Sequence, residues 1–105
     1  MTPELDIDQL RANAASAGAL LKALANPDRL LLLCQLSQGE RNVTELEELL
    51  GIQQPTLSQQ LAVLRREGLV ATRREGKQIY YRISSSEALA VITTLYQLFC
   101  ERGQQ

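Results

Sequence analysis

The sequence predicts a mainly α-helical single domain with one β-hairpin, within residues 1–105. Two observations indicate this class. Apolar residues recur at three- and four-residue steps along most of the chain, which is typical of amphipathic helices. After Gly68 the period changes to about two, and two β-rich segments, LVATRR and QIYYRI, flank the sequence EGK. The length suits one domain with a modest core, so we expect about five helices and a two-stranded hairpin.

The first helix is expected over residues 8–24, where the apolar stripe consists of Leu10, Ala14, Ala17, Leu21 and Leu24. The segment ANPDR then stops the chain and starts a second helix. Asn26 suits the N-cap, and Pro27 suits the first turn because its missing N–H has no partner there in any case. This second helix is apolar on most sides and ends before Gly39, so we expect it to be central.

A helix-turn-helix is expected over residues 43–67. Asn42 and Glu45 have the spacing of a capping box at the start of its first helix. Gly51 can adopt the left-handed conformation that closes this helix. A second helix begins near Gln54 after only a few residues, and two short helices joined by such a turn form the motif.

The hairpin is expected over residues 69–83 and a last helix over residues 85–102. Ser84 and Glu87 have the spacing of a helix start. Along this helix the apolar positions are Leu89, Ile92, Leu95, Tyr96 and Phe99. The order of helices, helix-turn-helix, hairpin and final helix is that of a winged helix-turn-helix domain.

The charge is unevenly distributed, although the formal net charge is only -1. Residues 55–82 contain six basic and two acidic side chains, whereas the rest of the chain is acidic. A solvated charged face is the simpler explanation of such a cluster. Its position on the helix-turn-helix and hairpin favours a surface that faces nucleic-acid phosphates.

The second helix of this motif enters the DNA major groove with its N-terminal residues at the base edges. Gln59 and Gln60 carry amides that can pair with adenine. Hydroxyl and amide groups for bases or phosphates are also expected from Gln54, Thr56 and Ser58. Phosphate contacts are expected from Arg65 at the helix end and from Arg73, Arg74 and Lys77 on the hairpin. Arg65 or Arg66 can instead pair with Glu67 or another nearby acid.

Three segments, ALANPDRL, QPTLSQQLAVLRREGLV and REGKQIYYRI, resemble the ArsR/SmtB family of bacterial winged-helix repressors. The resemblance covers roughly residues 19–100. It implies a homodimer, held by the first and last helices, that binds double-stranded operator DNA with an inverted repeat and is released by an inducer. The apolar stripes on these two helices also favour a dimer, although each stripe can pack within its own domain.

Two sensing sites of the family are absent from this sequence. The arsenic-type members carry Cys-x-Cys in the helix that here has the sequence VTELEELL, which contains no Cys. Zinc and nickel members use His and acidic residues on the last helix, and this chain has no His. We therefore expect no metal site of these two kinds.

Two cysteines remain, Cys34 in the second helix and Cys100 in the last. Each can be a packing residue, since free Cys behaves as a small hydrophobe. Their positions resemble those of the reactive-sulfur sensors BigR, SqrR and HlyU within the family. That resemblance implies that persulfides or oxidants link Cys34 to Cys100, directly or through extra sulfur atoms, and lower the affinity for DNA.

Other interpretations stay open at the level of sequence. The two thiols can be ligands for a soft metal or metalloid, or the protein can be a constitutive DNA-binding or anti-activating factor. Winged helices also bind proteins. An enzyme is disfavoured because the chain lacks His, a Gly-rich phosphate loop and a nucleophile elbow, so no cofactor is expected. With no signal-peptide pattern and no long apolar run, we expect a cytoplasmic protein without membrane contact.

Overall fold

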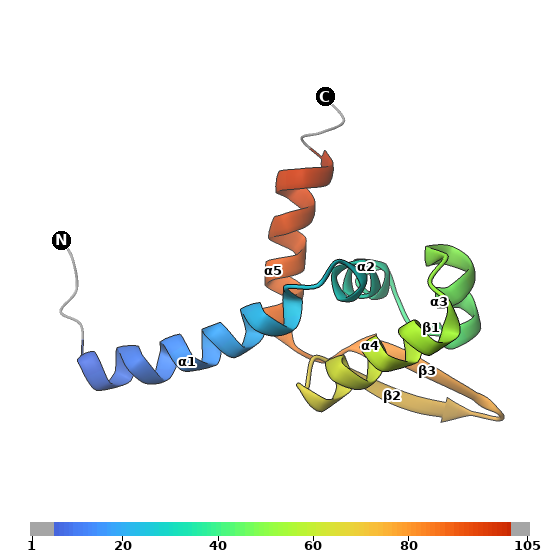
Figure 1. The fold of residues 1–105 in the computed structure, drawn as a ribbon, viewed down its shortest axis with the longest axis horizontal. Coiled ribbons are helices and arrows are strands. Elements are labelled where there is room, and N and C mark those ends of the chain that lie inside the picture. The colour runs from blue at the N-terminus through green and yellow to red at the C-terminus, as the bar shows by residue number, and fades with distance from the viewer. Residues whose placement is uncertain (1–5, 102–105) are drawn as a thin grey trace.

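The computed structural model describes residues 6–101, and these form a mainly helical domain with a small antiparallel sheet (Figure 1). Its helices are α1 (Ile7–Leu24), α2 (Pro27–Leu36), α3 (Val43–Leu50), α4 (Gln54–Arg66) and α5 (Ser86–Tyr96), and α5 continues into a π-helical turn (Gln97–Glu101). The strands are β1 (Arg41–Asn42), β2 (Val70–Glu75) and β3 (Gln78–Ile83). The predicted winged helix-turn-helix class is confirmed.

Helix α2 lies at the centre of the core, as its apolar sequence predicted. Leu32, Leu33 and Leu36 are buried, and α2 packs against α1, α3, α4, α5 and β3. From α4 the core receives Leu57, Leu61 and Leu64, which recur at helical spacing and hold one face of that helix against the body. The opposite face of α4 is therefore left for a partner.

Local capping fixes where the middle helices begin and end. The Asn26 side chain accepts a hydrogen bond from the Arg29 N–H at 3.1 Å, with Pro27 in the first turn of α2. The predicted capping box of α3 is present, since Asn42 and Glu45 bond each other's backbone N–H at 2.8 and 2.9 Å. Gly51 closes α3 with φ of 68°, a conformation that favours glycine.

The sheet differs from the predicted two-stranded hairpin in two ways. A short third strand, β1, pairs with β3 and gives the order β1-β3-β2. The hairpin strands begin at Val70 rather than Leu69, and Glu75 belongs to β2 because it pairs with Gln78. The connecting turn is therefore Gly76 and Lys77, and Gly76 has φ of 62°.

The last helix begins one residue later than the sequence predicted. Ser85, rather than Ser84, is the N-cap of α5, and its hydroxyl accepts a hydrogen bond from the Ala88 N–H at 3.0 Å. Ser84 instead prolongs the pairing of the sheet, since its N–H donates to the carbonyl of Leu69. The regular α-helix ends at Tyr96, and residue 102 of the predicted span lies outside the described residues.

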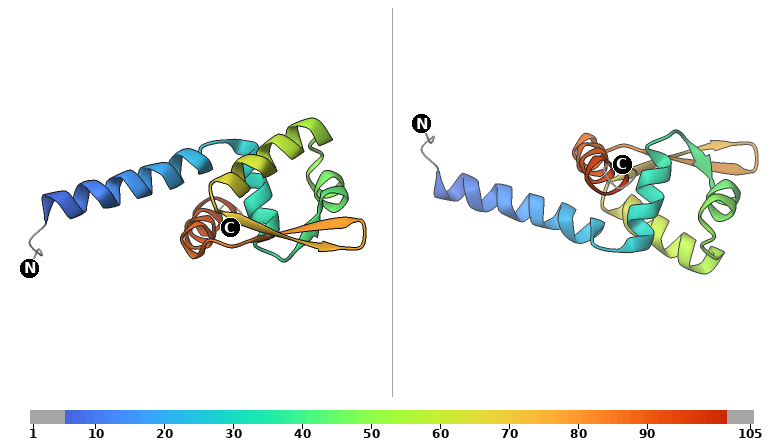
Figure 2. Two further views of the ribbon diagram at one scale, coloured as in Figure 1. Left: turned by 90° about the horizontal axis from the view of Figure 1, so that it is seen from below. Right: turned by 90° about the horizontal axis from the view of Figure 1, so that it is seen from above.

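Helices α1 and α5 project from the body in different directions (Figures 1 and 2). The radius of gyration is 15.9 Å, whereas a compact domain of this length has about 13 Å. Large apolar side chains are exposed on both helices, namely Ile7, Leu10 and Leu21 on α1 and Leu89, Tyr96, Leu98 and Phe99 on α5 and its extension. Among residues 6–101, no helix combines the length and the apolar character needed to span a bilayer.

Candidate nucleic-acid interface and cysteine pair

The exposed start of α4 carries most of the predicted base-contacting residues. Gln54, Ser58 and Gln59 are exposed, and Thr56 is half-buried. Gln53, the N-cap residue, makes no side-chain capping bond, and the first turn contains no acidic residue. The free N–H groups and positive dipole end of α4 are therefore left to interact with a negatively charged ligand such as DNA.

Gln60 has different surroundings from the neighbouring Gln59. Its side chain is half-buried, and its Oε1 accepts a hydrogen bond of 2.8 Å from the Arg29 guanidinium of α2. The amide predicted to contact a base is thus already engaged within the protein. Arg29 did not stand out in the sequence, because an Arg in the first turn of a helix is ordinarily a surface residue.

The hairpin cations are also in unequal environments. Arg73 donates to Glu40 at 2.8 Å and to Glu75 at 2.7 Å, and its guanidinium lies 4.6 Å from the centre of the Tyr80 ring. These two carboxylates raise the pKa of Arg73 above its ordinary value. Arg74 donates to the carbonyl of Gly76 and has no acidic partner among residues 6–101, and Lys77 is exposed in the turn, so both are better placed for phosphates.

A shallow hollow lies between α4 and the sheet. It is lined by Ser58, Ala62, Arg65, Arg66 and Tyr81, so side chains of the helix and of β3 share one concave surface. Arg66 lies 3.8 Å from Glu67, as one of the sequence alternatives foresaw, whereas Arg65 is exposed toward the hollow. Tyr81 was not among the predicted residues because it shares one face of β3 with Ile79 and Ile83, a pattern that also fits a core residue.

The fold brings the two cysteines into one neighbourhood, because α2 packs against α5. Cys34 is half-buried against the core, and Cys100 is exposed in the π-helical turn. Burial raises the pKa of the Cys34 thiol, and the negative charge of a Cys100 thiolate raises it further. Both cysteines are free thiols, and the charge on one acts on the other.

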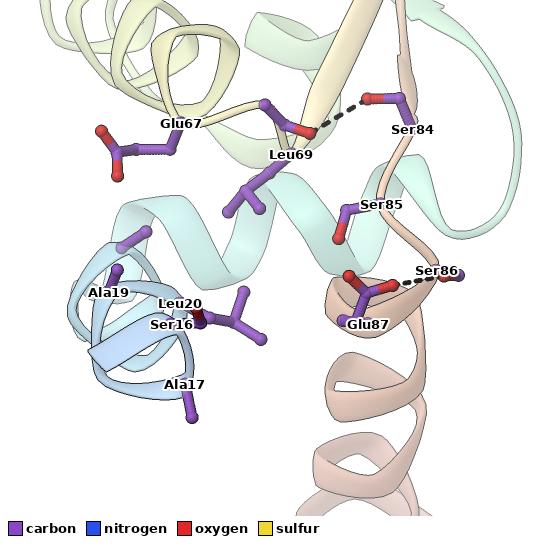
Figure 3. Close-up of a pocket in the computed structure, with 12 residues that line it drawn as sticks. Ser16, Ala17, Ala19, Leu20, Glu67, Leu69, Ser84, Ser85, Ser86 and Glu87 are labelled. Atoms are coloured by element: carbon purple, nitrogen blue, oxygen red, sulfur yellow. Dashed lines mark hydrogen bonds between the residues drawn. The ribbon is translucent and has the colours of Figure 1, made fainter. Parts of the chain in front are cut away.

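A metal site and the hollow beside α1 are both weaker candidates than the surfaces described above. Within the described part of the chain, no group of three or more His, Cys, Asp or Glu side chains could hold a metal ion. A hollow of about 570 Å³ lies in the angle between α1 and the start of α5 (Figure 3). Its lining combines small residues with Ser84, Ser85 and Ser86 and the carboxylates of Glu67 and Glu87, so it holds no thiol or imidazole.

Comparison with known proteins identifies the family. Residues 26–72 match the model described as bacterial regulatory protein, arsR family. The chain is 52% identical over 97 residues to the biofilm growth-associated repressor of Agrobacterium fabrum, covering 92% of this chain and 83% of that protein. It is 44% identical over 100 residues to the transcriptional activator HlyU of Vibrio cholerae, covering 95% and 93%.

Solved structures agree with these relatives. The repressor BigR from Xylella fastidiosa superposes with a TM-score of 0.83 at 47% identity, over 91% of this chain and 98% of that one. Reduced HlyU from Vibrio cholerae gives a TM-score of 0.84 at 47% identity, over 88% and 97%. The chain therefore belongs to the ArsR/SmtB family of bacterial winged helix-turn-helix transcription regulators.

Proposed function

We propose that the protein is a dimeric repressor whose affinity for its operator falls when Cys34 and Cys100 are joined by reactive sulfur species or oxidants. The observation that carries this proposal is the packing of α2, which holds Cys34, against α5, whose π-helical extension holds Cys100. They are the only cysteines of a chain that has no His. A sulfur-based trigger is therefore better supported than the metal triggers of other family members.

The DNA-binding surface proposed here has two parts. Gln54, Ser58 and Gln59 on the exposed start of α4 contact base edges, with Thr56 at their side. Arg65, Arg74 and Lys77 contact the flanking phosphates. Uncharged polar groups suit the bases because they donate and accept hydrogen bonds, whereas long cations suit the phosphates because they neutralise charge.

The proposed dimer uses the projecting helices α1 and α5. Their exposed apolar side chains are costly to leave in water, and burying them against a second copy removes that cost. A two-fold dimer then presents two copies of α4 at a separation of about one DNA turn, roughly 34 Å, which matches an inverted repeat.

Whether occupancy of the operator blocks or permits transcription depends on the promoter. The relatives from Agrobacterium and Xylella are named repressors, and the Vibrio relative is named an activator. One dimer that displaces either a polymerase or another DNA-binding protein accounts for both names. We favour repression because two of the relatives and the BigR structure carry that description.

The proposed chemistry has two steps. A Cys100 thiolate attacks the outer sulfur of a small persulfide, RSSH, which releases RS⁻ and leaves a persulfide on Cys100. The Cys34 thiolate then attacks the inner, Cys100-bound sulfur, which forms the Cys34–Cys100 disulfide and releases HS⁻. The protein pair loses two electrons, and the departing sulfur gains them. A hydroperoxide, ROOH, leads to the same disulfide: it transfers one oxygen to Cys100 as a sulfenic acid and leaves as ROH, and attack by Cys34 then releases water.

We propose that helix packing transmits the effect of the Cys34–Cys100 bridge to the DNA-binding helix α4. It ties α2, which packs against α4, to α5, which forms part of the proposed dimer interface. A covalent link between them changes the angle at which each α4 meets its half-site. A tenfold loss of affinity requires only about 1.4 kcal/mol, so a small change of angle is sufficient.

Operator binding by the wild type, Cys34→Ser, Cys100→Ser and the double variant, with and without glutathione persulfide, tests this function. We expect the persulfide to weaken binding at least tenfold in the wild type and to leave the double variant unchanged. Mass spectrometry of the treated wild type should show Cys34 linked to Cys100. Equal loss of binding in the double variant would exclude these thiols as the trigger.

A soft metal or metalloid remains the second candidate, since two thiolates can bind such an ion across a dimer. Stoichiometric binding of arsenite or cadmium, together with loss of DNA binding and no sulfur adduct, would favour it. A constitutive factor would show the same operator affinity in all four proteins under every treatment.

A further inference from the structure

Arg29 connects three helices through one guanidinium group. Its Nη1 donates to Oε1 of Gln60 in α4 at 2.8 Å. Its Nε donates to the carbonyl of Ala23 at 2.5 Å, and its Nη2 donates to the carbonyl of Lys22 at 3.3 Å, both in the last turn of α1. A planar fork of donors suits such a three-way junction.

The local structure holds Arg29 firmly at this junction. Its backbone N–H is bonded to the Asn26 cap, which fixes the residue in the first turn of α2. The last carbonyls of a helix have no partner within the helix, and a cation near them is favourable. Arg29 therefore meets both requirements of the α1 terminus through Nε and Nη2, and its Nη1 is left to bond Gln60.

Side-chain packing between α1 and α4 is loose at this point. A hollow of about 450 Å³ separates them, lined by Ala19, Lys22, Ala23, Arg29, Val63, Arg66 and Glu67. The hydrogen bonds of Arg29 cross from one helix to the other beside this hollow. The angle between α1 and α4 thus depends strongly on the guanidinium and its acceptor in Gln60.

We propose that Arg29 is a positioning residue for DNA binding and that Gln60 is its anchor on α4 rather than a base-contacting residue. This inference rests on the proposed function, in which α1 belongs to the dimer interface and α4 enters the major groove. Since two half-sites must be met at once, α4 has to keep a fixed angle to the dimer interface. Binding geometry of this kind tolerates errors of about 0.5 Å or 10–20°.

A double-mutant cycle on operator binding tests the link. Gln60→Met keeps volume, helix propensity and charge but removes the acceptor, and Arg29→Lys keeps the charge but removes the fork. We expect each change to weaken operator binding about tenfold, the range for a hydrogen bond to a charged group. The double variant should be no more than about twofold weaker than Arg29→Lys alone, because Gln60→Met removes only a hydrogen bond that Arg29→Lys has already broken.

The base preference of Gln60→Glu separates positioning from base contact. A carboxylate at position 60 still accepts from Arg29, so we expect operator affinity within about threefold of the wild type and an unchanged preference at every base pair. If residue 60 contacts a base, the carboxylate should shift that preference from adenine toward cytosine. A loss of fold stability would lower the affinity for every sequence alike, so it cannot produce a shift from adenine toward cytosine.

Gln59→Met is the matched control, because Gln59 is the exposed neighbour on the same helix. It should lose discrimination at one base pair, and its effect should add to that of Arg29→Lys. Additive losses for Gln60→Met and Arg29→Lys, or a base shift in Gln60→Glu, would overturn the positioning role while leaving DNA binding intact. Unchanged operator binding in Gln59→Met would instead contradict the proposed DNA-binding surface itself.

Discussion

The two thiols of this protein have different chemical surroundings. Cys34 is half-buried, and both burial and the charge of Cys100 raise its pKa, so its thiolate is less populated than that of an ordinary thiol. Cys100 is exposed in the π-helical turn. The thiolate is the nucleophile in sulfur exchange, so the proposed chemistry gives the first attack to the exposed Cys100 and the resolving step to Cys34.

Replacing Cys100 tests this assignment through the pH dependence of Cys34. In Cys100→Ser one of the two causes of the raised pKa is removed, so alkylation of Cys34 should reach its half-maximal rate at a lower pH than in the wild type. Burial remains, and the pKa should stay above that of a free thiol. Iodoacetamide labelling followed by mass spectrometry over pH 7–10 measures the pH of half-maximal alkylation of Cys34 in the wild type and in the variant.

Cys100→Asp is the matched control because it restores a negative charge without a thiol. Its Cys34 profile should stay at the higher pH, close to the wild type. Identical profiles for the Ser and Asp variants would show that the charge of residue 100 does not act on Cys34.

At the scale of single elements, the hairpin holds a charged network that competes with DNA. Arg73 bonds Glu40, in the connection before β1, and Glu75 on its own strand. Both carboxylates would have to give way before Arg73 could contact a phosphate. A phosphate contact of Arg73 thus remains a prediction, and such a contact would require Arg73 to give up its ion pairs with Glu40 and Glu75.

Glu40→Gln should strengthen DNA binding and make it more dependent on salt. With one carboxylate neutral, Arg73 is freer to contact a phosphate, and each such contact adds about 0.9 to the slope of log affinity against log salt. Fluorescence anisotropy at several salt concentrations gives that slope. Glu48→Gln, which removes the same charge from an exposed site on α3, should change the slope much less.

The start of α5 offers a second test of an element. Ser85→Ala removes the side-chain cap and should cost about 1 kcal/mol of unfolding free energy, or about 4–8 °C in Tm. Ser84→Ala, which loses only an exposed hydroxyl bond of 3.3 Å to the Gly68 carbonyl, should cost less. Thermal unfolding at one fixed protein concentration compares them, and a larger loss for Ser84→Ala would contradict this capping assignment.

At the scale of the whole molecule, the projecting helices have the most apolar surface exposed and the least support from the rest of the domain. Residues 6–19 are exposed along their whole length. An isolated helix of this length is only marginally stable in water, because its nucleation is unfavourable and few tertiary contacts offset that free energy. The stability of most of α1 should therefore depend on a second copy of the chain.

Leu21→Glu should abolish the proposed dimer while leaving the domain folded. Leu21 is 59% exposed, so a charge there costs the monomer little but cannot be buried against a partner. Sedimentation equilibrium should show a monomer, and hydrogen exchange should show faster exchange in the first turns of α1. The control Ala15→Glu, away from the apolar stripe of α1, should remain dimeric. If both variants were monomeric, or both dimeric, the proposed interface would be contradicted.

The elements of this protein were predictable from its sequence because their signals are local. The Asn26–Pro27 start, the Asn42–Glu45 capping box and Gly51 each act within a few residues, and the apolar spacing of α4 predicted which leucines are buried. The strand β1 was not predictable, since two residues show no alternation and are defined only by their partner β3. The start of α5 was misplaced by one residue because Ser84 is held by the sheet.

Tertiary structure alone decided which distant side chains meet. Gln59 and Gln60 are identical neighbours in sequence, yet only Gln60 faces Arg29, because the packing angle of α2 on α4 selects it. Arg73 is bound to Glu40 for a similar reason. The sequence by itself determined the helices, the hairpin and the residue types of the proposed DNA-binding surface. Packing between elements decides which cations are free of ion pairs and whether the charge of Cys100 acts on Cys34. No local sequence pattern encodes that packing.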